Sequence, residues 1–210
     1  MESVSKQEAL EALKRELAED ESLPLRESNL VFGEGDTDAE VVFIGEAPGQ
    51  NEDIQKRPFV GRAGQLLRLL IRGLGWREEQ VYITNIVKRR PPENRDPLPE
   101  EIEAYKPYLT RQIRILRPKI IVALGRFSMN YFLPDAKISR DRGKVFKIGG
   151  TLLVPLYHPA AALRSTSLRE VLEKDFKKLP KLVEKFDELM ESTEGTADGT
   201  PETSPQTNLF

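Results

Sequence analysis

Residues 41–64 read VVFIGEAPGQNEDIQKRPFVGRAG and are the most informative part of the chain. The first four of these residues form an apolar run typical of a buried strand, and the loop that follows is rich in glycine, proline and charge. An amphipathic pattern, QLLRLL, then begins at Gln65 and indicates a helix. A strand that leads through such a loop into a helix is a common arrangement of ligand sites in α/β proteins. The alternative is a surface loop built of turn residues.

Further along the chain, strand-like and helical patterns alternate. The predicted strands are 40–44, 81–87, 119–124 and 152–157, and the predicted helices are 4–19, 62–74, 98–116, 126–132 and 167–190. This alternation predicts an α/β fold, a three-layer α/β/α sandwich with a central four-stranded, mostly parallel sheet. The run IIVAL at 120–124 is apolar throughout, as expected for a strand covered on both faces.

The composition predicts one domain followed by a tail. Residues 1–190 carry the patterned segments, and a hydrophobic content of 39% suffices for one core. Residues 191–210 are rich in Ser, Thr, Gly, Pro and acid, and they predict a disordered acidic tail. The absence of cysteine excludes disulfides, thiolate metal sites and a cysteine nucleophile. With no signal-peptide or membrane-span pattern, we expect a cytoplasmic, nucleoid-associated monomer.

The net charge of −2 conceals a strongly uneven distribution. Residues 55–150 hold 21 Lys and Arg against 9 Asp and Glu, a balance of +12, whereas residues 1–40 hold 4 against 12, a balance of −8. A basic centre between acidic ends favours a polyanionic ligand. The alternative is that many of these arginines only solvate helix faces.

Three residues suited to ligand binding follow predicted strands. Phe59 comes after Pro58 in the first loop and is placed for stacking, Asn85 carries both a donor and an acceptor, and His158 is the only histidine. Because the carboxyl ends of parallel strands line one crevice, we expect the three to converge. A helix cap for Asn85 and a packing position for His158 are the alternatives.

Four motifs, taken together, are specific to one protein family. The segments GEAPG (45–49), RPFVGRAG (57–64), TNIVK (84–88) and HPAAALR (158–164) together resemble the type-4 uracil-DNA glycosylases, over residues 20–185. The resemblance implies an enzyme that flips deoxyuridine out of DNA and hydrolyses its N-glycosidic bond, starting base excision repair. A non-catalytic uracil sensor tethered to the sliding clamp is the alternative. A small-molecule hydrolase would leave the basic centre unexplained.

The resemblance also implies a role for each site residue. Phe59 would stack on uracil, the Asn85 amide would bond its O4/N3 edge, and His158 would bond O2 and stabilise the leaving base. Glu46, Ala47 and Pro48 would border the base and the attacking water. The catalytic set is thus Glu46, Asn85 and His158, with Asp53 left open as the group that positions water. The predicted DNA-backbone contacts are Lys88, Arg89, Arg90 and Arg164, with Arg95 nearby.

Type-4 enzymes usually hold a four-iron four-sulfur cluster through four cysteines, and here the chain departs from them. The corresponding positions are Asp20, Leu23, Arg89 and Tyr105, none of which can ligate such a cluster. We therefore expect no cluster and no metal. Apolar packing around Leu23 and Tyr105, with local ion pairs, is expected to replace it.

The end of the tail carries a separate pattern. Residues 206–210, QTNLF, resemble the Gln-x-x-Leu-Phe peptide that docks on bacterial sliding clamps. Gln206, Leu209 and Phe210 would be the anchors of this short linear ligand, and the acidic tail would be its tether. The alternative is a disordered end without a partner.

Overall fold

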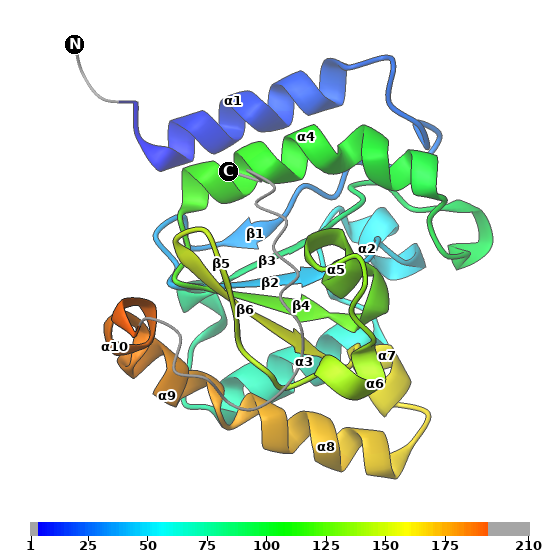
Figure 1. The fold of residues 1–210 in the computed structure, drawn as a ribbon. Helices are drawn as coiled ribbons and strands as arrows, with labels where there is room; N and C mark the ends of the chain where they lie inside the picture. Colours follow the sequence, from blue (N-terminus) through cyan, green and yellow to red (C-terminus); the bar gives the residue numbers. More distant parts are fainter. Residues whose placement is uncertain (1–3, 193–210) are drawn as a thin grey trace.

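A computed structural model describes residues 4–192, which form a twisted six-stranded sheet between two layers of helices (Figure 1). In sheet order the strands are β1 (Glu34–Gly35), β3 (Tyr82–Asn85), β2 (Val41–Gly45), β4 (Ile120–Leu124), β6 (Thr151–Leu156) and β5 (Phe146–Ile148). The central four are parallel, and the two edge strands are antiparallel to their neighbours. The three-layer α/β/α prediction is confirmed.

The predicted strand count of four was too low. The four predicted strands form the parallel centre, and β1 and β5 extend the sheet at its two edges. These edge strands are only two and three residues long and lie partly exposed. They carry no apolar run, so hydrophobic periodicity does not reveal them.

The sheet is covered on both faces because its strands are apolar at consecutive positions. In β2, Val42 and Ile44 belong to one core cluster, whereas Val41 and Phe43 belong to the other. Side chains alternate across a strand, so a continuous apolar run supplies both layers. The first face is covered by α1 (Lys6–Glu19), α4 (Pro99–Leu116) and α5 (Gly125–Phe132), and the second by α3 (Arg62–Gly73), α8 (Thr166–Phe176) and α9 (Leu179–Glu184) (Figure 1).

Four of the five predicted helices are observed within two residues of their expected bounds. Helix α1 begins after Ser5, whose hydroxyl accepts from the Glu8 amide while the Glu8 carboxylate accepts from the Ser5 amide. The fifth, 167–190, was wrong as a single helix. It is divided into α8, α9 and α10 (Phe186–Glu191), and Pro180 lies in the first turn of α9. Proline lacks the amide that an uninterrupted helix would need there.

The remaining helical elements are single turns or little more. They are α2 (Gln50–Gln55), α6 (Ile138–Asp141), α7 (Pro159–Ala162) and the 3₁₀ turns at Glu78–Gln80 and Pro92–Asn94. Within residues 4–192 there is no helix with the length and apolarity to cross a bilayer. Most of the predicted tail, with Gln206, Leu209 and Phe210, lies outside the described residues.

Candidate active site

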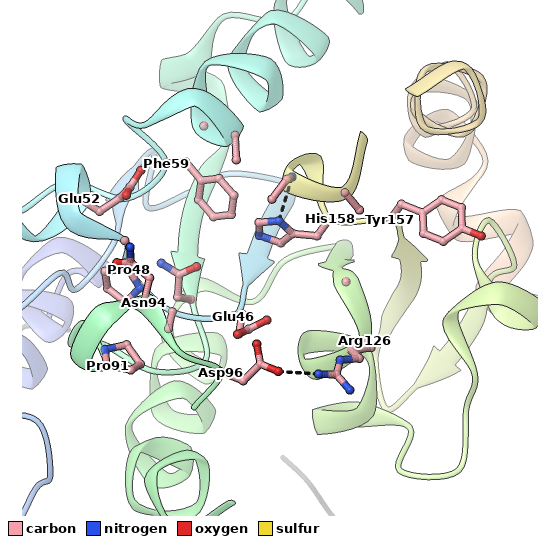
Figure 2. A pocket seen from close by; sticks show the side chains of 18 of the residues that line it. Glu46, Pro48, Glu52, Phe59, Pro91, Asn94, Asp96, Arg126, Tyr157 and His158 are labelled. Atoms are coloured by element: carbon pink, nitrogen blue, oxygen red, sulfur yellow. Dashed lines mark hydrogen bonds and ion pairs between the residues drawn. The ribbon is translucent and has the colours of Figure 1, made fainter. Parts of the chain in front are cut away.

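A pocket of about 660 Å³ opens at the carboxyl ends of the parallel strands. Its walls come from the loop after β2, the end of β3, the start of α5 and the segment after β6. This is the crevice in which open parallel sheets bind ligands. Figure 2 shows side chains from these separate segments pointing into the same space.

Phe59, Asn85 and His158 meet in this pocket. Gly45 and Asn85 are paired residues of β2 and β3, and a Cβ atom at Gly45 would overlap both the Asn85 Oδ1 atom and the Phe59 ring. The Phe59 and His158 ring centroids lie 5.8 Å apart, with the rings inclined by 32°. The aromatic face, the amide and the imidazole are therefore within reach of one small planar ligand, as the sequence predicted.

The backbone at Phe59 is unusual. Its φ is +53°, in the left-handed region that costs a non-glycine residue about 1–2 kcal/mol. A Cβ atom at Gly64 would overlap the Phe59 carbonyl, so this close approach requires glycine at position 64. The Glu52 carboxylate accepts from the amides of Val60 at 2.8 Å and Gly61 at 2.6 Å. The pocket therefore holds its aromatic ring on a strained but well-bonded loop.

His158 is set by local hydrogen bonding into one protonation state. It caps α7, and its Nδ1 accepts from the amide of Ala160 at 3.1 Å, as the dashed line in Figure 2 shows. Burial lowers the pKa of His158 to about 4, so the ring is neutral at pH 7. Because Nδ1 is an acceptor, the proton resides on Nε2. The imidazole is therefore a neutral N–H donor.

Glu46 is one of three carboxylates that line the pocket, with Glu52 and Asp96. Burial raises its pKa to about 7, the negative charge of Asp96 adds to the rise, and the positive charge of Arg126 opposes it. Asp96 and Arg126 form an exposed ion pair of 2.6 Å beside Glu46 (Figure 2). Near neutral pH, Glu46 is present in both protonated and ionised forms. That is the range in which a carboxylate can accept a proton from water.

Comparison with known proteins identifies the family to which the chain belongs. Residues 32–186 match the family model described as the uracil DNA glycosylase superfamily. A type-4 uracil-DNA glycosylase of Sulfurisphaera tokodaii is 48% identical over 187 residues, covering 83% of this chain and 85% of that protein. The chain belongs to the type-4 uracil-DNA glycosylase family. Type-4 relatives from Saccharolobus solfataricus and Thermotoga maritima are 53% and 45% identical, over 72% and 78% of this chain and 74% and 88% of theirs.

This type-4 pocket includes residues that sequence reasoning did not select. They are Glu52, Asn94, Asp96, Arg126 and Tyr157. Glu52, Asn94 and Tyr157 lie within the loops at the strand ends that carry the motifs, whereas Asp96 and Arg126 come from segments without a distinctive pattern. Asp53, the alternative water-positioning group, does not line the pocket, and its carboxylate accepts from the Asn29 amide at 2.7 Å. Of the two acids, the pocket contains Glu46.

Two of the predicted DNA contacts are wrong. Lys88 is fully buried, and its Nζ donates to Thr84 Oγ1 and Gln112 Oε1, each at 2.6 Å. Arg89 is only 8% exposed and donates to the Ser28 carbonyl. Both side chains turn into the protein at the end of β3, where the strand is covered by α4 and the N-terminal segment. They cannot contact phosphates at the surface.

The other two predicted contacts are closer to the pocket mouth. Arg90 is half-buried and donates to Asn94 Oδ1 at 2.7 Å, so it holds part of the wall. Arg164 is exposed and lines the pocket. Arg95 and Arg126 line it as well, and sequence reasoning named only the first of them.

The four positions at which the resemblance implied cluster ligands do not fit an iron–sulfur cluster. We call Asp20, Leu23, Arg89 and Tyr105 the cluster corner. Tyr105 is fully buried and donates to the Pro24 carbonyl at 2.7 Å, Leu23 belongs to the same core, and Asp20 accepts from Tyr108 at 2.6 Å. No thiolate is present, and no group of three or more potential metal ligands occurs among residues 4–192. Apolar packing and hydrogen bonds are both present at these positions, and the Arg111–Glu16 ion pair links α4 to α1 nearby.

Proposed function

We propose that this chain is a monofunctional uracil-DNA glycosylase that flips deoxyuridine out of DNA and hydrolyses its N-glycosidic bond. The observation that carries the proposal is the convergence of Phe59, Asn85 and His158 on one pocket. The activity named for the type-4 relatives supports it. The reaction leaves an abasic site and free uracil and so starts base excision repair.

In this mechanism the C1′–N1 bond of deoxyuridine breaks, and its electron pair stays on the departing uracil. Negative charge then develops on the base, where the neutral His158 donates from Nε2 to O2. A water oxygen forms the new bond to C1′, and the water proton passes to the ionised Glu46 carboxylate. Uracil later takes a proton from solvent. Phe59 stacks on the ring and holds it in place.

Asn85 supplies discrimination against cytosine. Uracil presents an acceptor at O4 and a donor at N3, whereas cytosine presents an amino donor and a ring acceptor. An amide held in one orientation matches only one of these edges. A mismatched buried polar pair costs about 1–3 kcal/mol, which corresponds to about 5- to 150-fold.

The exposed side chains at the pocket mouth support DNA binding. Arg164 and Arg126 line the pocket and would contact phosphates of the bound DNA, and Leu163 is 39% exposed next to Arg164. An apolar side chain at this position can occupy the gap left by an extruded base. We further propose that the protein acts as a monomer on nucleoid DNA in the cytoplasm, without an iron–sulfur cluster.

A uracil-containing oligonucleotide tests the proposed activity. The wild-type protein is expected to produce alkali-labile abasic sites only where uracil stands, and Asn85→Ala is expected to lose most of that activity. Binding of the uracil oligonucleotide without any turnover would instead support the sensor alternative. Iron analysis of the pure protein tests the missing cluster, and stoichiometric iron would contradict it.

The clamp interaction is proposed from sequence. Gln206, Leu209 and Phe210 would anchor residues 206–210 on a sliding clamp through a short apolar motif. Deletion of residues 206–210 is expected to abolish clamp binding, measured by surface plasmon resonance, and to leave activity on a short oligonucleotide unchanged. Clamp affinity that survives the deletion would refute the proposal.

A further inference from the structure

Arg68 contacts the backbone of the loop that carries the Phe59 ring. It projects from α3, and its side chain is only 12% exposed. Its Nε donates to the Phe59 carbonyl and its Nη2 to the Pro58 carbonyl, each at 2.9 Å. Arg68 is absent from the residues that line the pocket. It therefore touches the backbone that carries Phe59 without touching the ligand space.

The peptide group between Phe59 and Val60 is held at both of its polar ends. Its carbonyl oxygen accepts from Arg68, and its amide donates to Glu52 at 2.8 Å. A rotation of this peptide plane would break bonds to two charged side chains, which are stronger than bonds between neutral groups. Since Phe59 has a φ of +53°, its backbone would otherwise relax toward the common negative region.

Two carboxylates hold Arg68 itself in place. Glu34 of β1 contacts Nη2 at 2.5 Å, and Glu78 of the 3₁₀ turn contacts Nη1 at 2.6 Å. Because the guanidinium is planar, bonds along its edges fix both its position and its tilt. The pairing also offsets the charge of a guanidinium that is largely buried. The edge of the sheet is thereby connected to the loop that presents Phe59.

We propose that Arg68 is a positioning residue for uracil binding, which acts by locking the Phe59 backbone in its left-handed conformation. The inference rests on the proposed glycosylase function, because it concerns how the ring meets the base. An arginine in a purely structural network would support folding equally well without any effect on the pocket. The bonds to Pro58 and Phe59 distinguish the two roles.

The first test compares Arg68→Ala with Arg72→Ala. Arg72 lies one turn further along α3, is 56% exposed and also contacts Glu78, but it makes no bond to the Phe59 loop. In single-turnover assays on a uracil oligonucleotide, Arg68→Ala is expected to lower kcat/KM about tenfold or more, as expected for loss of charged hydrogen bonds. Arg72→Ala is expected to remain within about twofold of wild type. Equal losses in the two variants would overturn the proposal.

A double-mutant cycle then asks whether Arg68 acts through Phe59. In a Phe59→Ala background, Arg68→Ala is expected to cause less than about a twofold further loss, because the platform is already gone. The same tenfold loss in both backgrounds would refute the positioning role. Arg68→Lys keeps a positive charge between Glu34 and Glu78 but loses the planar guanidinium and its paired hydrogen bonds. This variant replaces Arg68→Ala in the test if Arg68→Ala does not fold. It is expected to show a similar loss.

Amide hydrogen exchange provides a readout that does not depend on activity. The amides of Val60 and Gly61 are expected to exchange at least about tenfold faster in Arg68→Ala than in wild type, with the β2 and β4 amides unchanged. Unchanged exchange at Val60 and Gly61 would overturn the proposed lock. If instead the wild-type protein excises no uracil while this exchange difference is found, the proposed function fails and the lock stands.

Discussion

The pocket at the strand ends and the cluster corner are both assembled from distant segments, yet their polar groups differ in how they are bonded. The Asn85 amide, the His158 imidazole and the Glu46 carboxylate line the pocket. In the cluster corner, the hydroxyl of Tyr105 and the carboxylate of Asp20 bond to protein groups, whereas the buried Nε of Arg89 has no hydrogen-bond partner. A ligand site keeps donors and acceptors available, whereas a structural site satisfies most of them internally. Mutations in the first should change activity, and mutations in the second should change stability.

The largest effect expected from this contrast is at His158. His158→Ala removes the N–H donor that we propose stabilises the departing uracil, and losses of this kind lower kcat by about 10²- to 10³-fold. Single-turnover excision from a uracil oligonucleotide measures it, with thermal unfolding as the control for folding. Wild-type activity in this variant would show that the pocket is not the site of chemistry.

The next effect is a pH dependence set by Glu46. Its pKa is about 7, and the mechanism needs the ionised form, so kcat/KM should rise about tenfold from about pH 6 to about pH 8. His158, with a pKa of about 4, stays neutral across this range and adds no second transition. Glu46→Gln should lower activity and flatten the profile. A flat wild-type profile would exclude Glu46 as the titrating base.

The cluster corner should respond in stability alone. Tyr105→Phe removes the bond to the Pro24 carbonyl and keeps the ring, so the free energy of unfolding should fall by about 1 kcal/mol. Urea denaturation measures the loss, and kcat/KM should stay within about twofold of wild type. A large fall in activity with unchanged stability would mean that the corner and the pocket are coupled.

The smallest expected effect is on the salt dependence of DNA binding, which should differ between Arg164 and Lys88. Arg164→Ala should reduce the slope of log Kd against log salt for DNA binding by about 1, because one phosphate contact is lost. Lys88→Met should leave that slope unchanged, because Lys88 is fully buried. Fluorescence anisotropy over a salt series measures both. A reduced slope in Lys88→Met would place this lysine at the DNA.

The burial of Lys88 also predicts a dependence of stability on pH. It lowers the pKa of the ammonium group well below its ordinary value, because the charge is removed from water. The unfolded chain then binds a proton that the folded chain releases more readily. Stability should therefore rise with pH up to the ordinary pKa of lysine, and Lys88→Met should weaken that rise. A change in this pH dependence in Lys88→Met would show that the ammonium group is buried.

Much of the fold could be predicted because its signals are local. The apolar runs at 41–44 and 120–124 indicate strands covered on both faces, and the amphipathic pattern from 62 indicates α3. The edge strands β1 and β5 could not be found this way, because their pairing depends on neighbours rather than on their own two or three residues. The same holds for Lys88. In the sequence, Lys88 is part of the basic run Lys88–Arg90 and looks like a residue of an exposed loop. Only its bond to Gln112 of α4 in the folded protein shows that it is buried.

The residue pattern alone was enough to predict the four central strands and four of the helices, the absence of thiolates and the motifs that lie at the strand ends with Phe59, Asn85 and His158. Those features depend on residue type and short-range spacing. Two features became visible only in the folded chain: Asp96 and Arg126 adjust the pKa of Glu46, and Arg68 bonds the backbone of Phe59. These effects depend on distances of a few ångströms between residues far apart in the chain, and such distances exist only after the sheet and its two helical layers have packed.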